Sequence, residues 1–367
     1  MKSINDIIGG AQGLLDISFE LQSCFEETLN HQQKTFLQML RKIEEHMPLL
    51  DRPYKGTGRK PLPLKPFLRG QLAKSFFQIT TTSNLIERLK ADPNLRLLCG
   101  FDEVPGAASF SRVYNFFAEE NIISSVHDGL THETLKDKVV YHICRDSTAI
   151  SAREKKEKKK KKDQVLINRP DMRGKWSRKA GKRKKQPTEM EMQIAEEPSV
   201  SLERFNKKCS TGAKRNSKGN MSYWNGYKLH LDVSDWGYPI TACVTGANVQ
   251  DCLLAIPMEK MTEQKVTFCY SLMDKGYDAN QIHSFIKSRE RVPIIDLKKR
   301  NNGFCPELDP AKKERYKIRS TVERANSHLK DNLIPKAIYV KGHAKVSFVL
   351  FSAVLCLAAL KCLQFMC

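Results

Sequence analysis

Two aspartates stand where predicted β-strands end, a position from which carboxylates can hold a divalent cation. Asp146 follows the strand-like run 139–145, and Asp274 follows the run 266–273. Alternate residues of the second run are apolar, so Asp274 shares their face, where a lone carboxylate is costly to desolvate. A bound cation would remove that cost. Taken alone, each aspartate is more simply explained as the cap of the turn that follows it.

A third acid, Glu323, belongs to a regularly spaced set of polar residues. The set is Tyr316, Arg319, Glu323 and Lys330, which in one α-helix would fall within an arc of roughly 60° and face one way. Two alternatives stay open. The set could be an exposed salt-bridge face, with Arg319 and Glu323 as an ordinary pair. Ser320-x-x-Glu323 could also be a capping box, which would leave Tyr316 and Arg319 in the preceding loop.

The elements that must position these residues differ along the chain. Before about residue 135, apolar residues recur at helical spacing in short segments separated by glycine and proline turns. The predicted helices are 19–46, 64–79, 85–90 with Thr82 or Ser83 as cap, 93–99, and 110–118 with Ser109 as cap. Short helices joined by tight turns are typical of helix-turn-helix DNA readers, in which Arg112 would contact a phosphate or a base. A helical packing domain is the alternative.

After about residue 200 the apolar residues recur with a period of two. The pattern predicts a β-hairpin over 227–245 that turns at 234–237, and an earlier strand over 138–144. It continues with a helix at 250–260, a strand at 266–273, a helix at 278–288, a strand at 292–296 and two helices to the end. This order predicts a mixed α/β sheet covered by helices. The first of the last two helices carries an apolar stripe able to pack on that sheet: Ile318, Val322, Ala325 and Leu329.

The positive charge of the chain is large and unevenly distributed. The chain has 62 Lys+Arg against 41 Asp+Glu, a net charge of +21, which points to a polyanionic partner such as nucleic acid. Residues 151–187 alone hold 17 basic and 4 acidic side chains. Because repelling charges cannot bury a common face, about 151–200 is predicted to be a mobile loop or arm. This run is either a solvated insertion or a nonspecific contact with phosphates.

The cysteines and apolar segments bear on the cellular compartment. Eleven cysteines lie without a CxxC pair, and several sit in apolar runs: Cys243, Cys269 and Cys356. This indicates buried thiols in a reducing compartment and excludes a zinc finger or a secreted disulfide framework. Residues 1–20 do not resemble a signal peptide. The apolar run 346–360 is short for a membrane span, so we expect a helix buried on the core or, alternatively, one used for dimerisation.

The order of these residues resembles the DDE transposases of bacterial insertion sequences. Asp146, Asp274 and Glu323 match the three acids in order, and the spacing Y-2-R-3-E-6-K from Tyr316 to Lys330 is the signature of one cut-and-paste group. Shorter matches are Asp146-Ser-Thr-Ala-Ile, Gly226-Tyr-Lys-Leu-His-Leu, Asp274-Lys-Gly-Tyr-Asp and, upstream, Gly58-Arg-Lys-Pro-Leu. The resemblance covers most of the chain. The segment between Asp274 and Glu323 leaves no room for the large β-rich insertion of some relatives.

The resemblance implies a fold and a division into domains. The fold would be a ribonuclease H-like mixed α/β sheet flanked by helices, preceded by an all-α N-terminal domain. The helical, DNA-binding domain would span residues 1–135. The catalytic domain would span residues 136–367 and include the basic insert at about 151–200.

The resemblance also implies an activity. Asp146, Asp274 and Glu323 would bind two Mg²⁺ ions, with Mn²⁺ as a possible substitute, while Tyr316, Arg319 and Lys330 would hold the backbone of the transposon end. The enzyme would cleave at the terminal inverted repeats and transfer the 3′-hydroxyls to target DNA, as a homodimer in a synaptic complex. It would work in the bacterial cytoplasm, on the nucleoid, without a membrane partner. The alternatives are a catalytically inactive DNA-binding protein or repressor, and a general nuclease with the same core.

Other acids compete with these three as metal ligands. Asp232 lies on a predicted strand and is the second choice. Asp235, Asp251 and Asp278 fall at a turn and at helix starts, where caps are the better explanation. The histidines show no spacing typical of metal ligands.

Overall fold

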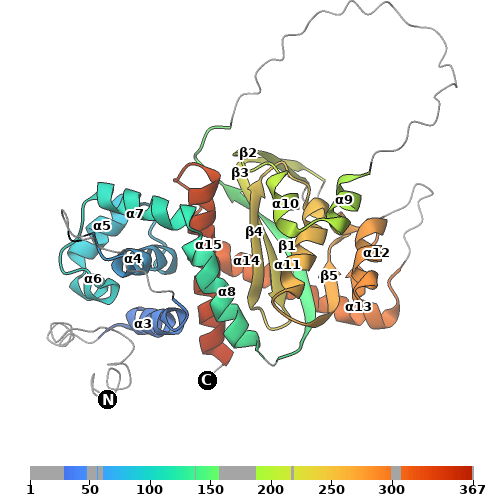
Figure 1. Cartoon of the computed structure of the whole chain (residues 1–367), viewed down its shortest axis with the longest axis horizontal. Helices are drawn as coiled ribbons and strands as arrows, with labels where there is room; N and C mark the ends of the chain where they lie inside the picture. The colour runs from blue at the N-terminus through green and yellow to red at the C-terminus, as the bar shows by residue number, and fades with distance from the viewer. Residues whose placement is uncertain are drawn as a thin grey trace, which may run out of the picture.

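The computed structural model describes residues 29–47, 56, 61–136, 138–156, 187–215, 219–298 and 307–365. These residues form a group of helices near the N-terminus, a mixed sheet with helices on both faces, and a long last helix between the two (Figure 1). This is the predicted fold class, a mixed α/β sheet preceded by helices.

The helices before the sheet, residues 31–135, are called the helical part below. They are α3 (His31–Glu44), α4 (Lys65–Phe76), α5 (Thr82–Ala91), α6 (Pro93–Cys99), α7 (Ala107–Glu119) and α8 (Ile122–Leu135). The prediction of α6 is confirmed at both ends, because Asp92 caps it through the Leu95 N–H at 3.0 Å and Gly100 ends it in a left-handed conformation.

Two predicted caps are wrong. Thr81 rather than Thr82 or Ser83 caps α5, and α7 begins after Gly106, so that Ser109 lies inside its first turn. The sequence also missed α8. The part of the first predicted helix before residue 29 lies outside the described residues.

The sheet orders its strands β2-β3-β1-β5-β6, with β4 also paired to β3. The strands are β1 (Val140–Ser151), β2 (Ser210–Arg215), β3 (Met221–Ser234), β4 (Pro239–Gly246), β5 (Phe268–Met273) and β6 (Val292–Ile295). β1 runs antiparallel to β3 and parallel to β5. The expectation that the first strand ends at Asp146 is wrong, because pairing with β3 carries β1 on to Ser151.

Gly226 lies where β1, β2 and β3 meet. Its φ is +154°, and a Cβ atom there would lie 2.1 Å from the carbonyl oxygen of Ile150. Only glycine permits this close approach of two strands.

Helices cover both faces of the sheet (Figure 1). On one face lie α9 (Glu189–Ala195), α10 (Pro198–Glu203), η1 (Asp251–Leu254), α11 (Ala255–Glu263), η2 (Lys275–Tyr277) and α12 (Asn280–Ser288). The chain then continues through α13 (Pro310–Tyr316), η3 (Lys317–Arg319), α14 (Ser320–His328) and η4 (Leu329–Leu333). Of these, α14 packs against β1 and β3 on the opposite face.

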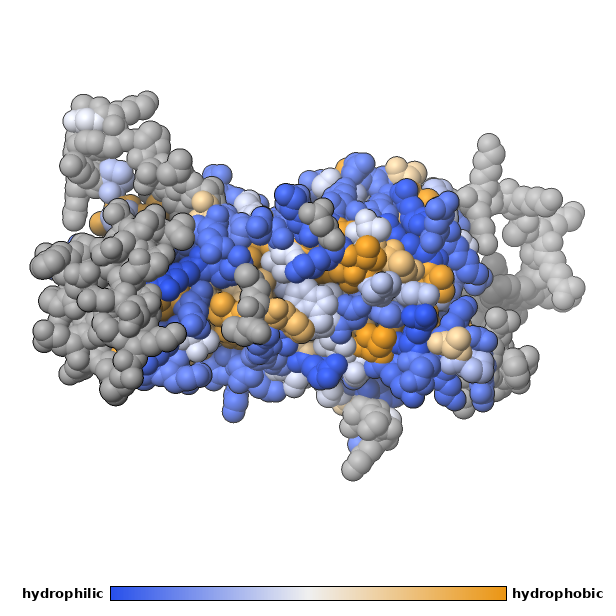
Figure 2. All heavy atoms as spheres, turned by 90° about the horizontal axis from the view of Figure 1, so that it is seen from below, coloured by the Kyte–Doolittle hydropathy of each residue, from blue (hydrophilic) through white to orange (hydrophobic). Residues whose placement is uncertain are grey.

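The last helix, α15 (His343–Phe365), is the centre of the core. It packs against α3, α4, α7, α8 and β4, and so joins the helical part to the sheet. Within the described residues it is the one helix long and apolar enough to cross a membrane, with a mean hydropathy of 2.3, but 78% of that stretch is buried in the protein itself. The prediction of a buried core helix is confirmed. Figure 2 shows a mostly hydrophilic face, on which apolar side chains form separate areas.

The basic segment is described only at its ends. Residues 157–186 lie outside the described residues. The predicted arm is helical at its C-terminal end, where α9 and α10 pack against α11. Among the described cysteines all thiols are free; Cys243 and Cys356 are buried as predicted, whereas Cys269 is exposed, so that prediction is wrong.

Candidate active site

Strand β1 sends two adjacent residues to opposite faces of the sheet, as strand geometry requires. Arg145 is fully buried toward α11, where its Nε and Nη2 each lie 2.6 Å from a carboxylate oxygen of Asp232 and its Nη1 donates to the Ala255 carbonyl at 2.8 Å. Asp146 faces α14, where the Asn326 amide donates to its Oδ2 at 3.3 Å. The sheet therefore separates a buried ion pair from a half-buried carboxylate.

Asp274 directly follows β5, the parallel strand next to the one that carries Asp146. Cys144 of β1 pairs with Leu272 of β5, and each aspartate is two residues further along its own chain. At the usual spacing of about 4.8 Å between strands, the two carboxylates lie at the same level and on the same face. Burial raises the pKa of Asp146 to about 6, and the charge of Asp274 adds to this rise. The Asp274 Oδ1 also accepts the Gly276 N–H at 2.8 Å, so the capping role holds as well.

The segment with the third acid is helical throughout, from Pro310 to Leu333. Arg319 has helical backbone angles and no side chain caps α14, so the capping-box alternative is wrong and Tyr316 lies in a helix. The predicted apolar stripe is confirmed, since Val322, Ala325 and Leu329 are buried and Ile318 packs against the core. The segment combines α-helical, 3₁₀ and π turns, so its side chains depart from one ideal helical arc.

Arg319 connects the acids. Its guanidinium forms an ion pair with Glu323 and lies over the Tyr316 ring, 5.6 Å from the ring centroid. Burial alone would lower the pKa of Arg319, but Tyr316, Glu323, Asp146 and Asp274 together raise it. The arginine is thus close enough to both aspartates to interact with their charges.

Glu323 remains outside the aspartate pair. Its side chain is 53% exposed and is held by Arg319. Within the described ranges, no group of three or more His, Cys, Asp or Glu side chains is arranged to hold a metal ion. The structure therefore brings Asp146 and Asp274 together, with Glu323 on the adjoining helix and turned to Arg319.

Lys330 lies near the same carboxylate. Desolvation and the charge of Lys214 lower the pKa of Lys330, while Asp146 acts in the opposite direction. Lys214, on β2, also lowers the pKa of Asp146 against the effect of burial. Two lysines from different elements therefore contribute positive potential beside Asp146.

Sequence reasoning missed two residues of this site, Lys214 and Asn326, and gave no role to Tyr277, which packs with α11 and α12. Lys214 lies on a strand that no pattern predicted. Asn326 follows Glu323 by one helical turn; its side chain is buried and its Oδ1 has no hydrogen-bond partner among the described residues. Tyr277, three residues after Asp274, also buries a hydroxyl without such a partner. Burial raises the pKa of Tyr277, and the charges of Asp251, Asp146 and Asp274 add to it.

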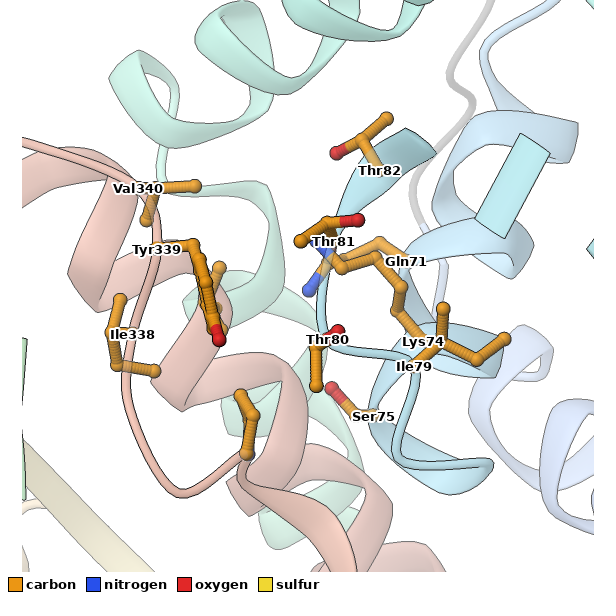
Figure 3. A pocket seen from close by; sticks show the side chains of 12 residues that line it. Gln71, Lys74, Ser75, Ile79, Thr80, Thr81, Thr82, Ile338, Tyr339 and Val340 are labelled. Carbon is orange, nitrogen blue, oxygen red and sulfur yellow. The ribbon is translucent and has the colours of Figure 1, made fainter. Parts of the chain in front are cut away.

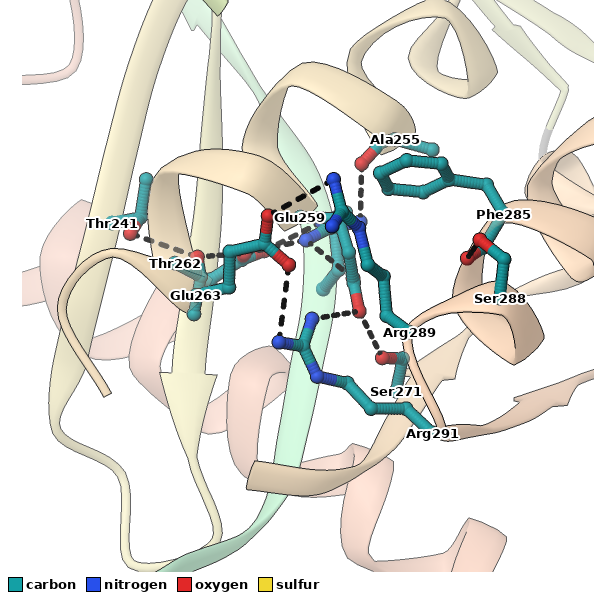
Figure 4. A network of polar contacts seen from close by, with 12 residues as sticks. Thr241, Ala255, Glu259, Thr262, Glu263, Ser271, Phe285, Ser288, Arg289 and Arg291 are labelled. Atoms are coloured by element: carbon teal, nitrogen blue, oxygen red, sulfur yellow. Dashed lines mark hydrogen bonds and ion pairs between the residues drawn. The ribbon is translucent and has the colours of Figure 1, made fainter. Parts of the chain in front are cut away.

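The second-choice acid, Asp232, is structural. It is fully buried and paired with Arg145, and it also accepts the Thr262 hydroxyl at 2.6 Å. The network continues through Glu259 and Arg291, which lie 3.5 Å apart (Figure 4). Asp232 therefore faces away from the aspartate pair.

The remaining candidates also have other partners or positions. Asp251 lies 2.9 Å from the Lys228 ammonium. Asp278 lies 3.1 Å from His283, and Asp235 lies 3.5 Å from His142. Arg112 is exposed on α7, a helix of the helical part that lies on the other side of α15 from the sheet (Figure 1).

Comparison with known protein families assigns most of the chain to two transposase domains. Residues 137–358, more than half of the chain, match the model described as Transposase DDE domain. Residues 24–115 match the model described as Transposase domain (DUF772). No curated protein and no solved structure matches the chain. The resemblance to DDE transposases is confirmed, while the Y-R-E-K group stays a prediction. The chain belongs to the DDE transposase family, whose catalytic domain is ribonuclease H-like and whose members act on DNA with divalent metal ions.

Proposed function

We propose that this protein is a DNA transposase that cleaves at the ends of its own element and joins the freed 3′-hydroxyls to target DNA. The observation that supports this most is the parallel register of β1 and β5, since Asp146 and Asp274 each follow a paired residue by two positions, next to the helical segment with Arg319 and Glu323.

The donor atoms of the site fit a hard divalent cation. Asp146, Asp274 and Glu323 supply carboxylate oxygens, the ligands that Mg²⁺ and Mn²⁺ prefer. Bound as a pair, such ions would activate the attacking hydroxyl or water and stabilise the leaving oxygen. The raised pKa of Asp146 fits this role, because a cation would relieve the cost of its half-buried charge.

Glu323 must exchange partners to join the aspartates. Arg319 holds it now, and arginine binds a phosphate through the same fork of donors. When Arg319 binds a DNA phosphate, its ion pair with Glu323 breaks, and the Glu323 carboxylate turns toward Asp146 and Asp274. Binding of the DNA end would in this way complete the site.

The neighbouring residues orient the acids and the DNA. Asn326 fixes the carboxylate of Asp146 through its amide. Lys214 and Lys330 neutralise backbone phosphates beside it, and Tyr316 donates its hydroxyl to a phosphate oxygen. Because two ends are cut, two sites are needed, so the working form would be a homodimer that pairs both inverted repeats in the bacterial cytoplasm.

One observation favours a second candidate, a catalytically inactive DNA-binding protein. Glu323 is paired with Arg319, and the described acids do not form a ready metal cluster. In such a protein this pair would be permanent.

A cleavage assay separates these functions. Wild type and Asp274→Asn would be incubated with a plasmid that carries the element and its inverted repeats, with Mg²⁺ or with EDTA. Asp128→Asn, which alters an acid of α8 paired with Lys265, is the matched control. We expect Mg²⁺-dependent excision by wild type and the control only. Equal cleavage by Asp274→Asn would refute the site, no cleavage by wild type would favour the inactive protein, and cleavage of plasmids without the repeats would indicate a general nuclease.

A further inference from the structure

A cavity of about 210 Å³ lies between the helical part and the chain after η4 (Figure 3). Gln71, Lys74 and Ser75 of α4 line one side, together with Thr80 to Thr82 at the start of α5. Ile338, Tyr339 and Val340 form the opposite wall, as Figure 3 shows. The function proposed above does not use this cavity.

The cavity contains a buried amide without partners in the described part of the chain, next to a mostly buried lysine. Gln71 is fully buried, and neither its amide nitrogen nor its oxygen has a hydrogen-bond partner among the described residues. Lys74 beside it is 7% exposed; no described carboxylate pairs with its ammonium, which lies 6.0 Å from the centroid of the Tyr114 ring. Burial lowers the pKa of Lys74 to about 8. Buried donors left unpaired are costly, which points to a ligand that would satisfy them.

The donors around the cavity are those that bind an oxyanion. Besides the Lys74 ammonium and the Gln71 amide, the hydroxyls of Ser75 and Thr80 also line the cavity as donors. Helix α5, ten residues long, begins here, and the Thr81 side chain satisfies only the Asn84 N–H. The other N–H groups of the first turn have no partner within the helix, and the helix dipole favours a negative charge at this end.

We infer that this cavity binds a single phosphate group, and that in the working protein it is a backbone phosphate of DNA. Ile338 in its wall forms a β-bridge with Ala152, and its N–H donates to the Ser151 carbonyl at 2.8 Å. Ala152 lies six residues beyond Asp146, about 20 Å along an extended strand. Six nucleotides of a duplex strand span about that distance. The inference that this phosphate belongs to DNA rests on the proposed function, whereas phosphate binding by the cavity does not.

Thermal unfolding in inorganic phosphate tests the cavity itself. Lys74→Met and Gln71→Leu remove its two buried donors, and Lys90→Met, at the exposed far end of α5, is the matched control. Against chloride of equal ionic strength, phosphate should raise the Tm of wild type and of Lys90→Met by mass action, and leave the other two unchanged. A Tm rise that is equal in all four proteins, or absent in all, would overturn the inference.

Duplex binding tests the source of the phosphate. With labelled duplex DNA from the end of the element, Lys74→Met should lower the salt slope of log Kd by about one relative to Lys90→Met. If Lys74→Met abolishes the effect of phosphate on Tm but leaves duplex binding unchanged, the cavity binds free phosphate and the inference that it binds a DNA phosphate is wrong. Asp274→Asn should still bind phosphate and duplex DNA and should lose only cleavage. The phosphate site in the cavity and the proposed active site are therefore tested independently.

Discussion

The amide of Asn326 donates a hydrogen bond to the carboxylate of Asp146, Nδ2 to Oδ2 at 3.3 Å, and so connects α14 to β1. Asn326 is buried, and packing of the neighbouring Val322 and Ala325 fixes the helix that carries it. A donor held in this way limits the rotation of the carboxylate. Asn326 is therefore a positioning residue for the proposed metal ligand.

Asn326→Ala should lower the cleavage rate by about 10- to 100-fold, the usual effect of losing a residue that orients a metal ligand. Because Asn326 does not contact DNA in this account, the Kd for duplex DNA should stay unchanged. The concentration of Mn²⁺ that gives half-maximal cleavage should rise, an effect that a general loss of folding would not produce. Asn332→Ala, an exposed asparagine on η4, is the control. An unchanged metal requirement in Asn326→Ala would contradict the role.

Asp146→Asn should abolish cleavage and yet stabilise the protein. Without metal, the buried charge of Asp146 is costly, which is why its pKa is raised to about 6. A neutral amide of the same shape removes that cost, so the free energy of unfolding at neutral pH should rise by about 1–3 kcal/mol. Urea unfolding in EDTA measures it. A destabilised Asp146→Asn would show that this carboxylate has a structural role instead.

Removing one charge of the buried pair Arg145–Asp232 should destabilise the protein, in contrast to Asp146→Asn. Asp232→Asn leaves a buried guanidinium without its full partner, so the free energy of unfolding should fall by about 3–5 kcal/mol. Replacing both residues with apolar ones, Arg145→Met with Asp232→Leu, should recover part of that loss, because the pair is removed as a unit and the buried Glu259, which also lies 3.2 Å from Arg145, keeps Arg291 as a partner. If the single and double variants were equally unstable, the ion pair would not be the cause.

The elements around the site were largely predictable from the sequence. Strand β5 ends just before Asp274, as alternating apolar residues predict, and the apolar stripe of α14 packs on the sheet. The length of β1 was not predictable, because polar residues beyond Asp146 are held in the strand by pairing with β3. Strand β2, Ser210–Arg215, was missed because it lacks an apolar alternation.

The site was predictable only in part. The sequence indicated the two aspartates and offered Arg319 and Glu323 as an ordinary ion pair, which the structure contains, but it did not decide between that pair and a place for Glu323 beside the aspartates. A single asparagine on a helix carries no pattern, so the role of Asn326 depends on how α14 docks against β1. The structural role of Asp232 likewise depends on the antiparallel register that sets it opposite Arg145.

The stability of wild type relative to Lys74→Met should depend on pH. The folded protein loses the Lys74 proton at about 8, whereas the unfolded chain keeps it up to the ordinary pKa of 10.5. Between these values the unfolded state binds more protons, so the stability of wild type rises with pH in this window. Below pH 8 Lys74→Met should therefore be the more stable protein, and the difference should close toward pH 10.5. A difference that stays constant over this range would contradict a buried, unpaired lysine next to Tyr114.

The most direct test of the whole account is the binding of Mn²⁺ to the full chain with DNA of the element's end, followed by electron paramagnetic resonance. Wild type and Asp128→Asn should bind about two ions per chain. Asp146→Asn, Asp274→Asn and Glu323→Gln should each bind fewer ions or bind them more weakly, with DNA affinity retained. Equal Mn²⁺ binding by all five proteins would contradict the claim that these three carboxylates hold the metal.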